Sequence, residues 1–594
     1  MTAELATEAA STLDSKRVFY NRFLLIVAGL GGLLYGVDVG IISGALPYLQ
    51  DTSGFTSGQL SFVAAAVLLG SVLSTLFAGL LADWMGRKWL MVLSGIMFVI
   101  SIPMIALSQG YGSLVFGRLL QGVSAGLIGI VVPLYLAECL VAAKRGQGTG
   151  IFQWLLTAGI AIAALIAFLF SLRLDHIAQS GNADAVFAFK NAAWRGIFWV
   201  SLPPGLLFVI GSFMLNESPR WLLRRGKQEA SYAALLRSRS REQADLELHE
   251  MQEVLASEKA KASASAKVKE SLLRRKYVIP FVLACVILAV NQATGINSII
   301  AYNTNILLQA GLSDLAAHIG YVLFTFVNFF MTIGAVVLVD RKGRKFLLGL
   351  GTAGIIISML CAGALFLRTE KLRVDAKNGV QSMVTPDQKL SLLYDKDISS
   401  KLYASSGANP TSLVVIYSYG DFRAASQAVR SDDPAAKAIK IDRSSVPSNR
   451  VIAFFSNPFG DLGAARTAPL KIENALITPV PGRENGWLVA ITLFVFMAFY
   501  AVGPGVCVWL ALSELMPTRI RSNGMSIALV LNQAVATIIA GIFLPTVGKY
   551  GYSVMFFGFA ACTVIYFITA VWFLPETKGK TLEEIEAIFE GVKA

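Results

Sequence analysis

The chain has 594 residues, of which 55% are hydrophobic and 15% are charged, and its formal net charge is +13. A soluble protein with this balance would consist almost entirely of core, so the composition excludes an ordinary soluble protein and indicates a polytopic membrane protein. The net charge by itself would fit a nucleic-acid-binding protein, but the distribution of the basic residues gives it another explanation.

Twelve apolar runs are long enough to cross a bilayer, which takes roughly 20 residues for about 30 Å of hydrocarbon. The first extends from Phe23 beyond Ala45 without a small-residue cleavage site, so we expect a helix and not a cleaved signal. The five cysteines all lie within such runs at unpaired spacings, which predicts neither a disulfide framework nor a thiol metal site. The runs begin near Phe23, Ser61, Trp89, Ser113, Gln147, Arg195, Tyr277, His318, Phe346, Trp487, Ser522 and Ser553.

Basic residues gather in one set of connecting loops. With the N-terminus taken as cytoplasmic, the short outer loops carry only Arg173, Lys190 and Lys549. This inner excess is the positive-inside pattern, so both termini are predicted to be cytoplasmic, and the basic charge reflects topology, with no nucleic-acid partner. The short inner loops carry Arg87, Lys88, Lys144, Arg145, Arg341, Lys342, Arg344, Lys345, Arg519 and Arg521.

Two ionisable residues lie deep within the runs. Asp38 is in the first run and Arg118 in the fourth, and at about 1.5 Å rise per residue both reach a comparable depth in the outer half of the membrane. Intramembrane charges usually face the bundle interior, pair with each other and mark functional sites. Asp38 and Arg118 are therefore candidate functional residues, and a purely structural salt bridge is the alternative.

Two charged motifs occur twice. Repetition at corresponding positions predicts two parallel six-helix halves, whose inner ends are joined by charge clusters. The repeats are Asp83-x-x-Gly86-Arg87-Lys88 with Asp340-x-x-Gly343-Arg344-Lys345, and the seven-residue spacing of Glu138 and Arg145 with that of Glu514 and Arg521.

The second half is interrupted by a long polar stretch, residues 369–486, which topology places outside the membrane. Strand-like segments at Ser412–Tyr419 and Arg450–Ser456 and a helix-like segment at Phe422–Arg430 predict a small α/β module there. Residues 217–276 have the charge spacing of cytoplasmic amphipathic linker helices. The expected division is 1–216 for the N-terminal half, 217–276 for the linker, 277–368 for helices 7–9, 369–486 for the insertion, and 487–594 for helices 10–12 with a cytoplasmic tail.

The seventh and tenth runs contain helix-weakening residues. Gly295 lies between Gln292 and Asn297, and Gly503 and Pro504 interrupt the tenth run near mid-depth. Interrupted spans at a repeat interface are typical of transport sites.

Neutral amides dominate the polar residues at mid-depth. Each amide both donates and accepts, as does each hydroxyl of a neutral polyhydroxylated solute, and Trp509 could provide a flat apolar face for a sugar ring. The alternative is that the amides join helices and Trp509 packs in the core. The amides are Gln153, Gln292, Asn297, Asn328, Asn532 and Gln533.

The chain resembles the sugar porter family of the major facilitator superfamily along nearly its whole length except residues 369–486. Asn216 stands where the family usually has proline. The resemblance is carried by Leu33-Leu-Tyr-Gly-Val-Asp38, the Asp83 and Asp340 loops, Gly117-Arg118, Pro133-x-Tyr-x-Ala-Glu138 with Arg145-Gly146, Glu217-Ser-Pro-Arg-Trp-Leu222, Gln292-x-x-Gly-x-Asn297, Gly503-Pro504 with Trp509, Ser513-Glu514 with Arg521, and Pro575-Glu-Thr-Lys-Gly-x-Thr581.

The resemblance implies roles for individual residues. Asp38 with Arg118 matches the proton-coupling pair of bacterial symporters, and Tyr302 matches an outer gating tyrosine. Gly503 and Pro504 are also expected to take part in gating. Asn291, Gln533 and Ala501 depart from common family residues. The implied sugar contacts are Gln153, Gln292, Asn297, Asn328 and Trp509, with Asn532 a weaker candidate. The implied cytoplasmic charge network comprises Asp83, Arg87, Glu138, Arg145, Glu217, Arg220, Asp340, Arg344, Glu514, Arg521 and Glu576.

We therefore expect an all-α membrane protein of the major facilitator fold, with 12 helices in two halves and an external α/β insertion between helices 9 and 10. The expected function is proton-coupled import of a monosaccharide across the cell membrane by a monomer, without cofactor or metal. A facilitative uniporter, an exporter and a membrane sugar sensor are the alternatives. An enzyme is disfavoured because no nucleophile–base set appears.

Overall fold

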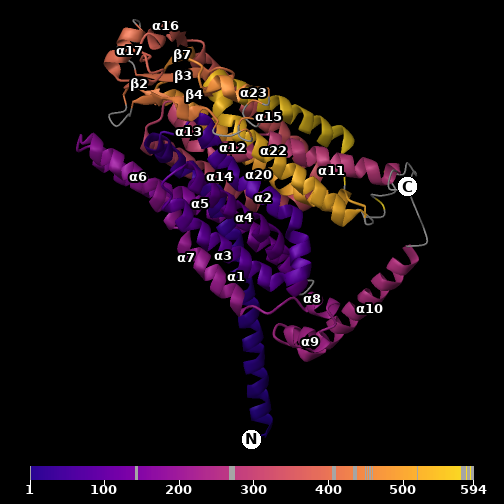
Figure 1. Cartoon of the computed structure of the whole chain (residues 1–594). Helices are drawn as coiled ribbons and strands as arrows, with labels where there is room; N and C mark the ends of the chain where they lie inside the picture. The colour runs from indigo at the N-terminus through magenta and orange to yellow at the C-terminus, as the bar shows by residue number, and fades with distance from the viewer. Residues whose placement is uncertain are drawn as a thin grey trace.

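The computed structural model describes residues 2–140, 145–265, 274–403, 410–432, 438–447, 459–517 and 520–576, with the single residues 450, 453, 457, 584 and 589. In this part of the chain, 12 helical segments are long and apolar enough to cross a membrane. The predicted helical membrane fold is confirmed, with a small sheet at one end (Figure 1).

The N-terminal half supplies six of the spans. The sixth begins at Ala183, earlier than the expected Arg195, because Asn182 caps the helix by accepting from the Ala185 N–H. Lys190 therefore lies on this helix and not in a loop, and it pairs with Asp51 at 2.7 Å. The helices are α1 (Thr2–Ser53), α2 (Ser57–Met85), α3 (Arg87–Ala106), α4 (Tyr111–Cys139), α5 (Arg145–Ala178), α6 (Ala183–Trp199) and α7 (Leu202–Met214).

The linker forms three helices, α8 (Pro219–Arg224), α9 (Gln228–Leu236) and α10 (Arg241–Ser265), as its charge pattern predicts. Their loops are fastened to the N-terminal half, since the buried Arg239 donates to the Cys139 carbonyl at 2.6 Å and Asn21 donates to the Ser238 carbonyl at 3.1 Å. We call the end of the bundle that bears α8–α10 the linker side, and the opposite end, which bears the sheet, the insertion side.

The C-terminal half contains both predicted interruptions. The seventh span breaks at Gly295, whose φ is +85°, and the tenth breaks at Gly503, directly before Pro504. The helices are α11 (Arg275–Ala293), α12 (Ile296–Ala301), α13 (Asn303–Gln309), α14 (Asp314–Lys342), α15 (Arg344–Glu370), α20 (Arg483–Val502), α21 (Pro504–Leu515), α22 (Arg521–Tyr550) and α23 (Tyr552–Ile568), and the π-helix η3 (Thr569–Phe573) ends the last span.

The insertion is built on an antiparallel sheet of order β1-β7-β3-β4, with β5 also paired to β3, and a second small sheet pairs β2 with β6. Leu413, Val415, Ile472 and Ile477 form its buried core, which is separate from those of the membrane helices. Its elements are β1 (Val374–Asp375), α16 (Lys377–Gln381), β2 (Leu390–Leu392), α17 (Lys396–Leu402), β3 (Thr411–Tyr419), β4 (Phe422–Ala425), β5 (Val429–Arg430), β6 (Ile439–Ile441), η2 (Arg443–Ser445), α19 (Leu462–Ala465) and β7 (Leu470–Pro479).

The sequence predicted this insertion only in part. The strand at 412–419 is confirmed as β3, but the helix at 422–430 is wrong, because Gly420 adopts φ +58° and turns the chain back so that Phe422 pairs with Tyr419. Most of the predicted strand at 450–456 lies outside the described residues, and the two described positions, Arg450 and Ala453, are helical. The central strand β7 was missed, although Leu470, Ile472 and the polar residues between them alternate as in a strand.

The apolar core differs between the two ends of the bundle. On the insertion side one cluster joins residues of both halves, including Ile41 and Leu60 with Tyr302 and Phe543. On the linker side each half has its own cluster, one around Leu90 and Tyr135 and the other around Leu288, Leu348 and Val508. The halves are thus packed together on the insertion side and have separate cores on the linker side.

Candidate functional site

The predicted charge pair forms in the interior of the N-terminal half. Arg118 Nη1 of α4 lies 3.5 Å from Asp38 Oδ1 of α1, and each side chain is 1% exposed. The same nitrogen donates to Gln121 Oε1 at the much shorter distance of 2.6 Å, and the Phe198 ring lies 5.4 Å from the guanidinium. Among the described residues, Asp38 Oδ2 and Arg118 Nε have no hydrogen-bond partner. The carboxylate is therefore held loosely, and the arginine has a second acceptor beside it.

Three of the predicted sugar contacts form one hydrogen-bonded cluster. Gln292 of α11 donates to Asn532 Oδ1 of α22 at 3.2 Å, and Asn297 of α12 donates to Gln292 Oε1 at 2.8 Å. The turn at Gly295 allows this, because its positive φ lets α12 begin directly after α11 and brings Asn297 back toward Gln292. The amides satisfy one another here, so a ligand that both donates and accepts could replace these mutual contacts.

Gln153 and Asn328 belong to a different pair of packed helices, α5 and α14. The rings of their neighbours Trp154 and Phe329 are 5.4 Å apart, which places the two amides at the same level of that interface. Within the described part of the chain, no hydrogen bond joins them to the Gln292 cluster, and Thr332 donates to the Asn328 carbonyl at 2.7 Å. The side chain of Trp509 lies outside the described residues. The structure thus joins three of the six predicted contacts and leaves two apart.

Two further amides also bind other helices. Asn291 donates to the Tyr500 hydroxyl at 3.4 Å, and Gln533 donates to Ser71 Oγ at 3.3 Å. The second bond crosses between the halves, because Ser71 belongs to α2 and Gln533 to α22. It lies near the middle of both helices.

Tyr302, the predicted gating residue, lies in the apolar core that joins the two halves on the insertion side. It is fully buried, donates to the Ala540 carbonyl at 2.9 Å and stacks on Phe543 with ring centroids 4.5 Å apart. Its hydroxyl also lies 3.4 Å from Ser61 Oγ of the N-terminal half, and the Leu544 N–H donates to that same Oγ at 3.1 Å. Ser61 therefore connects the two halves beside Tyr302. Gly503 and Pro504 form the break between α20 and α21, where Gly503 lies against Leu347 and Gly351 of α15.

Other contacts that close the insertion side were missed from the sequence. Tyr48 donates to Asp314 Oδ2 at 3.0 Å, Asn305 to Gln50 Oε1 at 2.7 Å, and Tyr321 to the Gly40 carbonyl at 2.8 Å. Each joins α1 to a helix of the C-terminal half. Polar residues near helix ends are common, so nothing in their spacing distinguished these residues from solvated ones.

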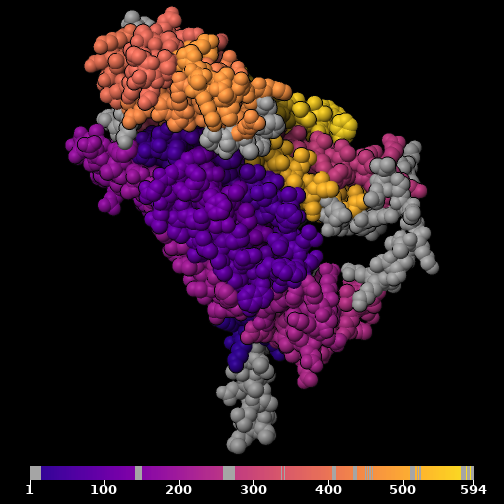
Figure 2. Space-filling view, in the orientation of Figure 1, coloured from indigo at the N-terminus to yellow at the C-terminus, as the bar shows by residue number. Residues whose placement is uncertain are grey.

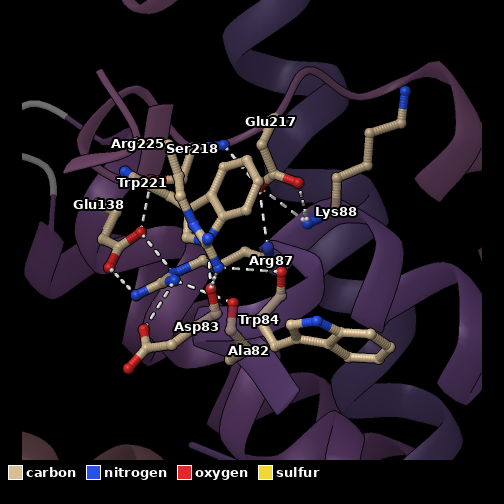
Figure 3. Close-up of polar contacts among 10 residues, drawn as sticks. All are labelled: Ala82, Asp83, Trp84, Arg87, Lys88, Glu138, Glu217, Ser218, Trp221 and Arg225. Carbon is tan, nitrogen blue, oxygen red and sulfur yellow. Dashed lines mark hydrogen bonds and ion pairs between the residues drawn. The ribbon is translucent and has the colours of Figure 1, made fainter. Parts of the chain in front are cut away.

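The predicted charge network on the linker side is present in the N-terminal half (Figure 3). Arg87 contacts Asp83 Oδ1 at 3.0 Å and is bidentate to Glu138, at 2.9 and 3.0 Å. The Glu217 carboxylate accepts from the backbone N–H groups of Arg87 at 2.8 Å and Lys88 at 3.1 Å, so it caps α3. Burial raises the pKa of Glu217, and these backbone donors oppose the rise only in part.

Trp221 and Arg225 belong to the same cluster and were not predicted. Trp221 Nε1 donates to the Asp83 carbonyl at 2.8 Å, and Arg225 donates to it at 2.7 Å, so both satisfy the end of α2 (Figure 3). Arg220, which was predicted, is exposed and makes no contact with this cluster among the described residues. A helix of α8's length presents only some of its side chains to its neighbour, and sequence alone did not identify which.

The C-terminal half repeats the cap. Glu576 accepts from the backbone N–H groups of Arg344 at 3.2 Å and Lys345 at 3.1 Å, as Glu217 does in the other half. Gly86 and Gly343 precede the two capped helices at φ +97° and +88°, and a Cβ on either would overlap the capping carboxylate. The side chains of Arg145, Asp340, Glu514 and Arg521 lie outside the described residues.

Comparison with known proteins gives concordant matches. The family model "Sugar (and other) transporter" matches residues 24–385 and 474–589, which leaves out most of the insertion. The glucose transporter GlcP of Staphylococcus epidermidis is 27% identical over 569 residues, 95% of this chain and 97% of that protein. The arabinose-proton symporter of Escherichia coli is 26% identical, covering 98% of this chain and 96% of that protein.

One relative is named as a facilitated transporter. Solute carrier family 2, facilitated glucose transporter member 12, of Xenopus laevis is 26% identical over 94% of this chain and 88% of its own length. Among solved structures, the partially occluded inward open conformation of the E. coli xylose transporter XylE has a TM-score of 0.64 at 19% identity, covering 95% of this chain and 99% of that one. This structural likeness shows the fold.

Proposed function

The chain belongs to the sugar transporter family of the major facilitator superfamily, and from this premise we propose that it imports a monosaccharide together with a proton by alternating access. It is a membrane transporter and not an enzyme. Relatives of both kinds, proton symporters and facilitated transporters, match this chain, so the relatives do not favour either kind of transport. The residues of this chain favour coupling to a proton.

The observation that carries the coupling is the buried Asp38–Arg118 pair. Two opposite charges in a low-dielectric interior are costly when either is left unpaired. Asp38 holds Arg118 by a single 3.5 Å contact, while Gln121 already accepts from the same nitrogen at 2.6 Å. Protonation of Asp38 removes its attraction for Arg118, and Gln121 remains as the partner of the arginine. The first and fourth helices can then separate without exposing an unpaired carboxylate.

The amide cluster supports a neutral sugar as the substrate. Gln292, Asn297 and Asn532 offer donors and acceptors and no net charge, which suits hydroxyls better than an ionic substrate. Relatives named for glucose, arabinose and xylose favour a monosaccharide. Gln153 of α5, Asn328 of α14 and Trp509 are proposed to contact the same sugar from positions opposite the Gln292 cluster.

The two ends of the bundle support alternating access. One core joins the halves on the insertion side, and Tyr302 seals it, whereas the halves have separate cores on the linker side. This is the arrangement of an inward-facing transporter whose outer gate is closed. The excess of Lys and Arg in the loops of the linker side favours a cytoplasmic location for that side and for both termini, in the cell membrane. We take the working unit to be a monomer.

The test is uptake of radiolabelled monosaccharides by proteoliposomes, with and without an inward proton gradient. We expect the gradient to drive accumulation, and Asp38→Asn to abolish accumulation while sugar exchange continues. Asp175→Asn, an exposed aspartate at the end of α5, is the matched control and should accumulate sugar normally. Accumulation by Asp38→Asn would disprove the coupling role. Uptake that never exceeds equilibrium in the unmodified protein would indicate a uniporter, and binding without flux would indicate a sensor.

A further inference from the structure

A cavity of about 90 Å³ lies between the insertion and the membrane helices, on the insertion side. The helices of both halves contribute to its walls through Gln50, Ser57 and Asn305, and the insertion contributes Ser412 and Gln427. A cavity needs at least about 10–15 Å³ of such space to hold one water, so this one holds several. This vestibule cavity is large enough for a small polar solute. Figure 2 shows the insertion, in orange, lying over the ends of both halves.

The vestibule cavity is rich in carboxamides. Gln50, Asn305, Gln309 and Gln427 line it from α1, α13 and the insertion. Asn305 is only 6% exposed. Its Nδ2 donates to Gln50 Oε1 at 2.7 Å, but its Oδ1 has no hydrogen-bond partner among the described residues. A buried acceptor without a partner is costly, so rotation of the Asn305 amide toward the cavity, where a bound molecule supplies a donor, would be favourable.

The charge of the cavity favours a neutral ligand. Its charged lining residues are Glu370 and Arg373, which pair with each other at 3.5 Å. Tyr552 also lines it and stacks on Phe366 with centroids 4.8 Å apart, so an aromatic surface lies beside the amides. Donors, acceptors and an apolar face without net charge are what the hydroxyls and C–H faces of a sugar require.

We propose that the vestibule cavity is a second sugar-binding site, built by the insertion and distinct from the transport site. The assignment rests on the proposed function, because the ligand is taken to be of the class that the protein transports. Ser412, Ser426 and Gln427 of its walls come from residues 386–473, which the family model does not match. The site is therefore shared between the transporter core and this chain's insertion, which completes its walls.

The vestibule cavity adjoins the contacts that Ser61 makes with Tyr302 and Leu544. Leu544 lines the vestibule cavity, and its backbone N–H donates to Ser61 Oγ, the atom that the Tyr302 hydroxyl approaches to 3.4 Å. A sugar held in the vestibule cavity is separated from the Tyr302–Phe543 stack by Leu544, the residue that follows Phe543. When that stack opens, the sugar can move to the amide cluster at Gln292 without passing through bulk solvent.

The test is equilibrium binding of radiolabelled D-xylose, D-glucose and L-arabinose to the purified full-length protein. We expect two saturable components. Gln309→Leu should weaken one about fivefold or abolish it, as expected for one lost hydrogen bond, and Gln292→Leu should remove the other. Gln309→Glu, which keeps the size but adds a charge, should also lose the first component. Gln243→Leu, an exposed glutamine on α10, is the matched control.

The outcomes separate this site from the proposed function. A retained Gln292-dependent component proves that the Gln309 variants are folded. A single component in the unmodified protein that both Gln309 variants retain would overturn the vestibule site while leaving the transport proposal intact. Two components without uptake in proteoliposomes would support the vestibule site and refute the transport proposal. A single component that only the Gln309 variants lose would assign the binding to the vestibule alone.

Discussion

The two ends of this molecule are held together in different ways. On the insertion side the halves share one apolar core and are linked by hydrogen bonds from α1 and α2 to the C-terminal half, such as Asn305 to Gln50 and Tyr48 to Asp314. On the linker side the strongest polar contacts lie within one half, such as Arg87 with Glu138 and the Glu217 cap on α3. Contacts between halves can be exchanged during transport, whereas contacts within a half keep each half rigid.

The difference explains where charge is used. The charged caps and the Arg87–Glu138 pair fasten helices within a half at the linker ends of α2, α3 and α15. The contacts between the halves on the insertion side are mainly hydrogen bonds and stacked rings, with the Asp314 carboxylate as the acceptor in one of them, and a hydrogen bond exchanges for water at a lower cost than a buried ion pair. Four experiments test this contrast, in order of decreasing effect.

The largest effect is expected from Gly86→Ala, which disrupts the Glu217 cap on α3, a contact within one half. A non-glycine residue at φ +97° costs about 1–3 kcal/mol, and its Cβ would overlap the Glu217 carboxylate, so charge-assisted bonds worth about 1.5–3 kcal/mol are lost as well. We expect a large fall in folded yield and in the thermal midpoint. Gly79→Ala on the exposed face of α2 is the control, and equal stability of the two variants would contradict the capping role.

The second largest effect is expected from Tyr302→Ala, which removes the side chain that contacts Ser61 of the other half. It removes a ring stack worth about 0.5–1.5 kcal/mol and a hydrogen bond worth about 1 kcal/mol, so the outward-open population should rise about 30-fold. Spin labels at the exposed Gln179 and Lys371 should report longer distances across the insertion side. Tyr302→Phe should give a smaller change of about fivefold. Tyr550→Ala, an exposed tyrosine on α22, should leave the distances unchanged.

A smaller effect is expected from replacing residues 374–479 with a short Gly/Ser linker. Val374 pairs with Ile477, so the two ends already lie side by side, and the insertion's separate core predicts that the membrane helices fold without it. The deletion removes the bond from Ser57 to the Ser426 carbonyl at 2.8 Å and that from Arg430 to the Leu308 carbonyl at 3.4 Å. The same spin-label distances should broaden modestly. A protein that fails to fold would show that the insertion is not independent.

The smallest effect is the pH dependence of the Glu217 cap. Because burial raises the pKa of Glu217 above its unfolded value, the folded protein binds this proton more tightly. Its contribution to stability is therefore full below the ordinary glutamate pKa and is lost as the pH rises through the raised value. The thermal midpoint of the unmodified protein, relative to Glu217→Gln, should fall as the pH rises from the ordinary glutamate pKa through the raised pKa of Glu217. Glu242→Gln, an exposed control, should show no such trend.

The sequence by itself determined the features that depend on local chemistry. Span-length apolar runs, the Gly295 and Gly503-Pro504 interruptions, and the twice-repeated Asp-x-x-Gly-Arg-Lys motif all predicted what the structure contains. Each depends on residues close together in the chain, because hydrophobic length, positive φ and proline act on the segment that carries them. The family followed from the same local motifs.

Only the tertiary structure decided which residues are partners. Gln292 could have bonded any mid-depth amide, yet it bonds Asn297 and Asn532 and not Gln153 or Asn328. Likewise β3 pairs with β7, more than 50 residues away, and Trp221 and Arg225 cap α2 where Arg220 was expected to contribute. Neutral amides and strand edges have no preferred partner until packing brings one within about 3 Å, so such choices leave no periodic signal in the sequence.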